Sequence, residues 1–205
     1  MRISSTEDRI LNGARELFFK QGIRTVTMDD IAEHLAISKK TIYTHYKDKD
    51  LIVRSVFNNL HEDQNKQILH IRKISENPID ELMKLMDYLG SFISQFNPAV
   101  FHDLQKNYPF VYSEFKINRE KELISYIEEN LRRGVKLELY RKEIKIKILS
   151  RLRIEMIHLG FNTDIFPSGQ FNYAEVQVAM LDHFLHGIVT LKGNKMITKY
   201  INGTK

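Results

Sequence analysis

The 205-residue chain contains no cysteine and no tryptophan, and its four prolines are widely separated. Without cysteine, disulfides and thiolate metal sites are excluded, which fits a reducing compartment. The chain has no run of about 18 apolar residues that would predict a membrane-spanning helix, and the segment MRISSTEDRI lacks the apolar core of a signal peptide. We therefore expect a soluble, cytoplasmic protein that is long enough to form one or two domains.

Sequence motifs of common enzyme classes are also missing. The chain has no G-x-S-x-G motif, no glycine-rich phosphate loop and no H-E-x-x-H motif. His183 and His186 are three residues apart on a predicted helix and could share a face, but a two-histidine metal site needs carboxylates or a second subunit to be complete. Histidines in a core or an interface are the more common case. We expect no catalytic residue, no cofactor and no metal site.

The positive charge of the chain is local rather than general. The formal net charge is +5, yet residues 1–50 hold nine Lys and Arg against eight Asp and Glu and are almost neutral. Within residues 38–49, four lysines accompany the single acidic residue Asp48. A cationic edge of this kind is what binding to DNA phosphates requires. The other basic runs, at residues 132–147 and 192–205, are interpreted as solvated helix faces.

Residues 27–49, TMDDIAEHLAISKKTIYTHYKDK, predict two short helices that are joined by a tight turn. Thr27 and Asp30 have the spacing of a capping box, so Thr27 is expected to cap the first helix. Ser38 is a natural cap for the second helix. Ile42 and Tyr46 are four residues apart and would pack on the apolar side of the first helix.

The opposite face of the second predicted helix is polar and cationic, which suits the major groove of DNA. We expect Lys39, Lys40 and Thr44 to contact base edges. For phosphate contacts through hydroxyl, imidazole or ammonium donors we expect Thr27, Thr41, Tyr43, His45 and Lys49, and Ser38 completes the predicted DNA-binding set. Two alternatives remain open: Tyr43 could pack against the first helix, and the whole segment could be an ordinary helical hairpin with solvated lysines.

These residues make the chain resemble the TetR family of transcriptional regulators. The resemblance rests on LFFKQG at the end of an N-terminal helix, followed by TVTMDDIA, AISKKTIYTHY and KDKDLI, and it covers about the first fifty residues. The chain departs from the family pattern at Ala36, where a glycine is usual, and at Lys40, where many members have a small residue. Because alanine lacks the freedom of glycine at positive φ, we expect a slightly different turn geometry.

Helical spacing of apolar residues continues along the rest of the chain, with proline and glycine as breaks. Helices are predicted at residues 4–20, 49–74, 79–96, 110–133, 139–160 and 171–192, and Gly134 is expected to end the fourth of them. The predicted fold is all-α. A three-helix helix-turn-helix DNA-binding domain would occupy residues 1–48, and a larger helical bundle for effector binding and dimerisation would occupy residues 49–205.

The family resemblance implies a homodimer that is formed by residues 139–160 and 171–192. A two-fold dimer places its recognition helices about 34–36 Å apart and so predicts a palindromic operator. The resemblance also implies a repressor that a small apolar or amphipathic effector releases from DNA. If such an effector binds in this domain, a workable mechanism is displacement of the helix at residues 49–74. The candidates for contact with this effector are Met86, Phe92, Phe96, Phe101, His102, Tyr108, Phe115 and His158.

Two other interpretations are kept alongside this one. Methionines and aromatic residues at helical spacing can line an adaptable pocket, but they more often form an ordinary core. The chain as a whole could be a helical protein-interaction module that does not bind DNA. The outward cations and hydroxyls of residues 39–44 distinguish the two functions, because a hairpin that does not bind DNA has no need of them.

Overall fold

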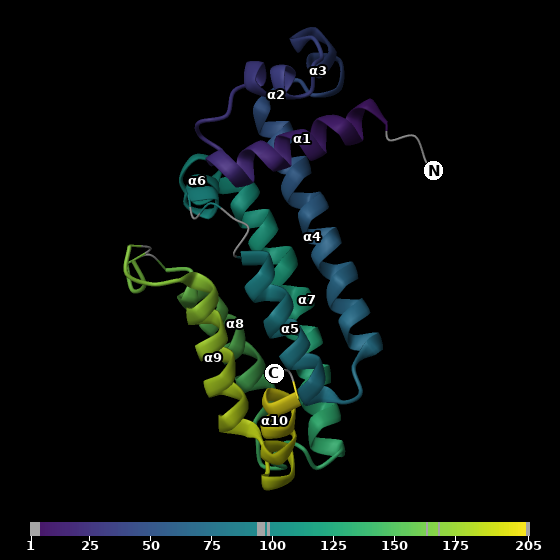
Figure 1. The fold of residues 1–205 in the computed structure, drawn as a ribbon, viewed down its shortest axis with the longest axis vertical. Helices are drawn as coiled ribbons and strands as arrows, with labels where there is room; N and C mark the ends of the chain where they lie inside the picture. The colour runs from purple at the N-terminus through teal and green to yellow at the C-terminus, as the bar shows by residue number, and fades with distance from the viewer. Residues whose placement is uncertain (1–4, 94–96, 98, 163, 168, 204–205) are drawn as a thin grey trace. The chain divides into compact units, whose positions relative to one another are not determined.

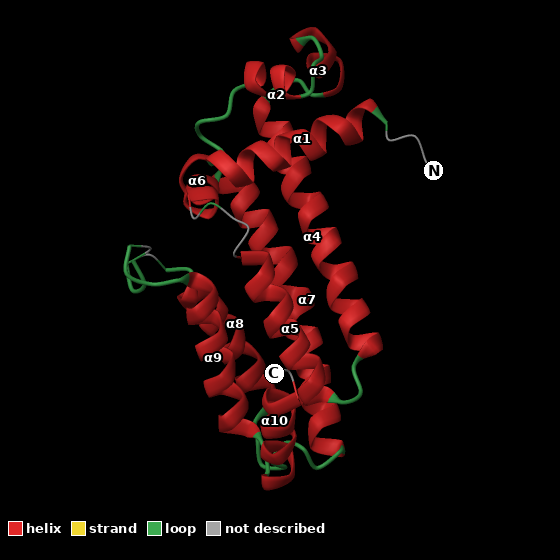
Figure 2. Ribbon diagram, in the orientation of Figure 1, coloured by secondary structure: helices red, strands yellow, loops and turns green. Residues whose placement is uncertain are grey.

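The computed structural model describes residues 5–93, 97, 99–162, 164–167 and 169–203. Ten helices and no β-strand are found in these ranges, which confirms the all-α prediction (Figures 1 and 2). The helices are α1 (Thr6–Gln21), α2 (Met28–His34), α3 (Lys39–His45), α4 (Lys49–Ile74), α5 (Pro78–Ile93), α6 (Ala99–Asn107), α7 (Pro109–Lys136), α8 (Ile146–Gly160), α9 (Tyr173–Ile188) and α10 (Leu191–Gly203). Not one of them is both long and apolar enough to span a bilayer over the part of the chain that is described.

Several helix ends are fixed by hydrogen bonds of nearby residues. The backbone of Gly22 has φ 89° and its N–H donates to Phe18, so glycine ends α1 as expected. Asp48 accepts a hydrogen bond from the N–H of Leu51 at 2.9 Å at the start of α4. The carboxamide of Asn77 accepts hydrogen bonds from Ile79 and Asp80 at 3.0 and 3.1 Å and thereby caps α5.

Several predicted helix boundaries were wrong. The helix predicted at residues 171–192 ends earlier, because α9 stops at Ile188 and α10 begins at Leu191. Two other wrong boundaries lie around Tyr140. Helix α7 continues through Gly134 to Lys136, and α8 begins at Ile146 instead of residue 139. The intervening segment is fixed by tertiary contacts: the N–H groups of Leu139 and Tyr140 both donate to the carbonyl of Gly134, and Tyr140 forms an isolated antiparallel bridge with Val189. Burial of this apolar pair therefore depends on a turn, not on a helix.

The chain forms two compact units, which are described separately. The first comprises residues 1–65 and 95–118, and the second comprises residues 66–94 and 119–205. In the first unit, buried apolar side chains of α1, α2, α3 and α4 form the interior, and α6 joins them because Asp103 accepts a hydrogen bond from the N–H of Arg24 at 2.9 Å. These units reflect packing, and the functional division at residues 48 and 49 stays a prediction.

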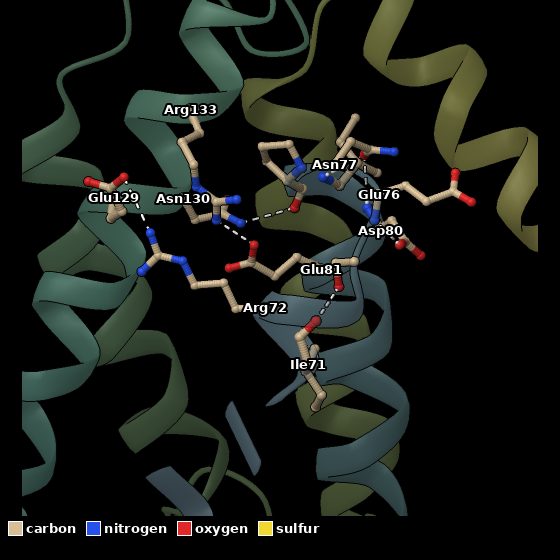
Figure 3. A network of polar contacts seen from close by, with 12 residues as sticks. Ile71, Arg72, Glu76, Asn77, Asp80, Glu81, Glu129, Asn130 and Arg133 are labelled. Atoms are coloured by element: carbon tan, nitrogen blue, oxygen red, sulfur yellow. Dashed lines mark hydrogen bonds and ion pairs between the residues drawn. The ribbon is translucent and has the colours of Figure 1, made fainter. Parts of the chain in front are cut away.

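The second unit contains a polar network within its apolar core, shown in Figure 3. Glu81 on α5 is fully buried and forms an ion pair with Arg133 on α7. The side-chain amide of Asn130 donates to the carbonyl of Pro78 and its oxygen accepts from the hydroxyl of Tyr140, both at 3.0 Å. These bonds tie the start of α5 to α7 and to the turn that follows it.

Candidate nucleic-acid interface

The first helix of the predicted hairpin begins with a complete capping box. The N–H of Asp30 donates to the hydroxyl oxygen of Thr27 at 3.2 Å, and the N–H of Thr27 donates to the Asp30 carboxylate at 2.7 Å. The Thr27 hydroxyl also donates to this carboxylate at 2.8 Å. The two hydrogen bonds that the carboxylate accepts, first the one from the Thr27 backbone and then the one from its hydroxyl, lower the pKa of Asp30. The sequence prediction of this cap is confirmed.

The turn between α2 and α3 keeps a left-handed residue without using glycine. Ala36 has φ 52°, and the N–H of Ile37 donates to the carbonyl of Ala32 at 3.0 Å. A left-handed conformation costs a residue with a β-carbon roughly 1–2 kcal/mol. The chain therefore accepts local backbone strain at Ala36 in the turn that places α3.

Helix α3 buries one side and exposes the other, as its sequence predicted. Ser38 caps it by accepting a hydrogen bond from the N–H of Thr41 at 3.0 Å. Ile42 and Tyr46 are buried in the first unit, and the Tyr46 hydroxyl donates to Glu7 at 3.4 Å. The exposed residues are Lys39, Lys40, Tyr43, Thr44 and His45.

The exposed side chains of α3 differ in whether they already form hydrogen bonds or ion pairs within the protein. The ammonium of Lys39 lies 2.8 Å from the Asp29 carboxylate on α2, whereas Lys40 forms no ion pair with any residue in the described ranges. The Thr44 hydroxyl donates to the carbonyl of Thr41 at 2.7 Å, and the Thr41 and Ser38 hydroxyl oxygens are 2.8 Å apart. Lys40 is therefore the most available cation on this helix.

Lys49, a predicted phosphate ligand, points into the first unit instead of lying free at the surface. Its ammonium donates to the carbonyl of Ile23 at 2.6 Å and lies 5.9 Å from the centre of the Phe18 ring. Burial lowers the pKa of this lysine. A phosphate contact by Lys49 would require it to leave this carbonyl, so we give it no role in the DNA contacts proposed below.

The predicted effector contacts fall into two groups, one in each unit. Phe101 and Tyr108 are half-buried in the first unit, His102 is exposed there, and Phe115 is buried. The Phe115 ring packs edge-on against Phe57 of α4 at 5.6 Å between centroids.

In the second unit, Met86 packs against the apolar core, and Phe92 stacks on Tyr88 at 5.9 Å. His158 lies 3.2 Å from the carboxylate of Glu120. Phe96 lies outside the described residues. The role of both groups in binding an effector stays a prediction.

Two buried polar residues escaped the sequence reasoning. Gln64 on α4 is 3% exposed, and neither atom of its carboxamide has a hydrogen-bond partner in the described part of the chain. Arg153 on α8 is 5% exposed, and its Nη1 is similarly unpaired. Buried polar groups are normally hydrogen-bonded, so both residues are unusual. One sequence signal could have found such residues, namely a polar residue in line with apolar residues on one helix face. Gln64, one turn after Leu60, is an example.

Apolar side chains on the outer face of α8 are exposed to solvent in the single chain. Ile148 is 66% exposed and Leu152 is 48% exposed. On α9 the helical spacing of residues 171–192 predicts that Ala179, His183 and Gly187 are buried, but all three are exposed. The buried side of α9 consists instead of Val176, Gln177, Leu181, Phe184, Leu185 and Ile188. The two helices predicted to form a dimer thus carry apolar or small residues on their outer faces.

Residues 10–56 match the model of a known family, "Bacterial regulatory proteins, tetR family". The chain is 26% identical over 201 residues to the uncharacterized HTH-type transcriptional regulator YvkB of Bacillus subtilis, with 89% of this chain and 97% of that protein covered. It is 30% identical over 95 residues to the probable HTH-type transcriptional regulator ArpR of Pseudomonas putida, and this alignment covers 46% of the chain and 43% of ArpR, less than half of that relative's length.

The fold is also similar to that of a solved structure. A TetR-family transcriptional regulator from Agrobacterium tumefaciens superposes with a TM-score of 0.72 at 16% identity, covering 90% of this chain and 97% of that one. The matched segment, residues 10–56, contains the capped α2, the turn at Ala36 and the outward face of α3 described above. The local motifs, the family model over residues 10–56 and the shared fold together support a TetR-family transcriptional regulator.

Proposed function

We propose that the protein is a dimeric repressor whose two α3 helices read a palindromic operator and which a small apolar or amphipathic effector releases from DNA. The observation that carries this proposal is the two-sided character of α3. Its back is fixed by the buried Ile42 and Tyr46, while Lys39 and Lys40 are exposed on its front. A rigidly seated helix with an outward cationic face has the geometry for entry into the major groove.

Base contacts are assigned to Lys39, Lys40 and Thr44, the exposed residues at the start and middle of α3. Phosphate contacts are assigned to Thr27, Ser38, Thr41, Tyr43 and His45. Tyr43 is exposed, which supports a phosphate contact over packing against α2. Loss of a base contact should cost about 1–3 kcal/mol at one operator position, whereas loss of a phosphate contact should weaken binding to all sequences alike.

Dimerisation through α8 and α9 is supported by their outer faces. Ile148 and Leu152 lie one turn apart on α8, and both are exposed to solvent in the single chain. Burial of such side chains against a second copy would remove apolar area from water, and a two-fold axis would match the symmetry of a palindromic operator. The Ile148→Glu variant should then be monomeric in light scattering. Ile117→Glu, on the equally exposed Ile117 of α7, should remain dimeric.

Release by an effector is supported by Gln64 of α4. This helix starts at Lys49, four residues after α3 ends at His45. A ligand that shifts α4 would therefore also shift α3, the proposed recognition helix. The unpaired carboxamide of Gln64 offers both a donor and an acceptor to a bound molecule. The effector must have a higher affinity for the state that does not bind DNA than for the state that does. Equal affinity for the two states would leave their populations unchanged.

The test is fluorescence anisotropy with duplex DNA from upstream of the gene, measured across a salt series. Wild-type protein should bind tightly and lose affinity steeply as salt rises. The Lys39→Ala/Lys40→Ala variant should lose this binding while keeping its helical circular dichroism. A control variant, Lys142→Ala/Lys147→Ala, removes two exposed lysines elsewhere and should bind like the wild type. If wild-type protein binds neither this DNA nor random duplex, the DNA-reading function is wrong and the helical interaction module becomes the better interpretation.

A further inference from the structure

Arg153 is a buried cation to which the described part of the chain supplies no partner. It lies on the inner side of α8 together with Ser150 and Ile154, and only 5% of its surface is exposed. No hydrogen bond or ion pair to its guanidinium occurs among the described residues, and its Nη1 atom is completely enclosed. Burial lowers the pKa of Arg153 to about 10, so the group still carries its charge at neutral pH.

Other arginines of the second unit show what is missing at Arg153. Arg133 is paired with the buried Glu81, and Arg72 lies 3.3 Å from the carboxylate of Glu129. Transfer of a charge from water to the interior is costly unless an opposite charge and hydrogen bonds replace the lost solvent. At Arg153 no described residue provides this replacement, so the unliganded protein bears an electrostatic cost that an anion could relieve.

The surroundings of Arg153 along the helix are apolar. Leu149 lies one turn before it and Ile157 one turn after it, and both are partly buried against the core of the second unit. The buried hydroxyl of Ser150 donates to its own helix, at the carbonyl of Lys147. A molecule that reaches the guanidinium must therefore combine a negative group with an apolar body.

A nearby basic side chain, His158, is not the better anion ligand. Its ring nitrogens lie 3.2 Å from Glu120 and 3.6 Å from Glu155. Two carboxylates already occupy the space around this imidazole and would repel an anion. Arg153 is thus the cation on α8 that is both buried and unpaired.

We propose that Arg153 binds the carboxylate or phosphate group of an otherwise apolar small molecule within the second unit. The planar guanidinium offers parallel N–H donors that match two oxygens of either group. The inference rests on the proposed function only in taking this molecule to be the effector. Binding itself requires no DNA and can be measured alone.

Isothermal titration calorimetry with three probes of equal chain length tests the site: decanoate, decyl phosphate and 1-decanol, each below the concentration at which it forms micelles. Wild-type protein should bind at least one of the two anions about tenfold or more tightly than the alcohol, because only the anions can pair with a charged donor. The stronger of the two anions identifies the carboxylate or the phosphate as the natural group. If the three probes bind alike, or if none of them binds, the proposal is wrong.

Two variants test whether Arg153 causes the preference for anions. Arg153→Met should bind the three probes alike, whereas Arg151→Met, at an exposed arginine two residues away on the same helix, should keep the wild-type preference. A preference that survives in Arg153→Met would overturn the assignment. Arg153→Met without ligand should also melt at the same temperature as the wild type or higher, because it removes an uncompensated buried charge. A clearly lower melting temperature would show that Arg153 is structural and would equally overturn the proposal.

Operator binding separates this inference from the proposed function. Arg153→Met should bind DNA as the wild type does in the anisotropy assay, and the anionic probe should no longer release it. If wild-type protein binds the anion but no DNA, the ligand site stands and the regulator function fails. If it binds DNA but none of the probes, the regulator function stands and the proposed ligand site is wrong.

Discussion

The ammonium of Lys39 on α3 and the carboxylate of Asp29 on α2 lie 2.8 Å apart, and both side chains are solvent-exposed. The hydrogen bond to Asp29 is the main cause of the raised pKa of Lys39. Exposed ion pairs of this kind add little to stability. The pair matters here for function, because Asp29 forms an ion pair with the ammonium of Lys39, which the proposed DNA contact would use.

Asp29→Asn should therefore tighten operator binding severalfold, because it frees the ammonium of Lys39 for the base contact assigned to this residue. Anisotropy titrations with operator DNA measure the affinity. Glu33→Gln removes the same charge from an exposed position on α2 that has no ion pair in the described structure, so its affinity should change much less. Weaker binding by Asp29→Asn would show that Asp29 positions Lys39 for DNA.

Ala36→Gly should raise the free energy of unfolding by about 0.5–1 kcal/mol. At φ 52° the alanine carries a left-handed strain of roughly 1–2 kcal/mol, and the greater entropy of glycine in the unfolded chain offsets only part of the relief. Urea denaturation followed by circular dichroism gives the difference. Glu33→Gly, within helix α2, should instead lower stability by up to about 1 kcal/mol. Equal losses for the two variants would mean that the turn at Ala36 is not strained.

The sequence was sufficient to predict features that depend on neighbouring residues. The caps at Thr27 and Ser38 and the break at Gly22 are set by residues within three or four positions, and all three appear in the structure. The outward face of α3 could also be predicted, because apolar residues four apart leave the other side of a short helix to solvent.

Features that depend on distant partners could not be predicted in this way. Leu139 and Tyr140 have the apolar pattern of a helix start, but their burial comes from contacts with Gly134 and Val189. The same reasoning placed the ammonium of Lys49 at the surface, whereas the carbonyl of Ile23 draws it inward. Arg153 is exceptional because none of the described residues pairs with its guanidinium, and no pattern in a single sequence can show this.

Gly134→Ala should lower the free energy of unfolding by roughly 3 kcal/mol, while Gly90→Ala should raise it by up to about 1 kcal/mol. A β-carbon at Gly134 would lie 1.9 Å from Cδ2 of Tyr140, whose ring is buried and tied to Asn130, so an overlap of this size cannot be relieved cheaply. A β-carbon at Gly90 of α5 would meet no atom within 4 Å, and alanine is the better helix former. Thermal and urea denaturation of both variants measure the contrast, and tolerance of Gly134→Ala would show that Tyr140 can move.

Arg133→Met should destabilise the protein by roughly 3–5 kcal/mol, because it leaves the carboxylate of Glu81 buried without its partner. Replacement of both residues, as Glu81→Leu/Arg133→Met, should recover most of this loss, since a buried ion pair stabilises little beyond well-packed apolar side chains. The preceding residue on α7 provides the control. Arg132 forms an exposed pair with Glu128 at 2.5 Å, and Arg132→Met should cost no more than about 0.5 kcal/mol. Urea denaturation of these three variants, of Glu81→Leu and of the wild type gives the coupling free energy of the buried pair. If the double variant is no more stable than Arg133→Met alone, the carboxylate of Glu81 is held by other groups of the network, and the ion pair is not what fixes α5 to α7.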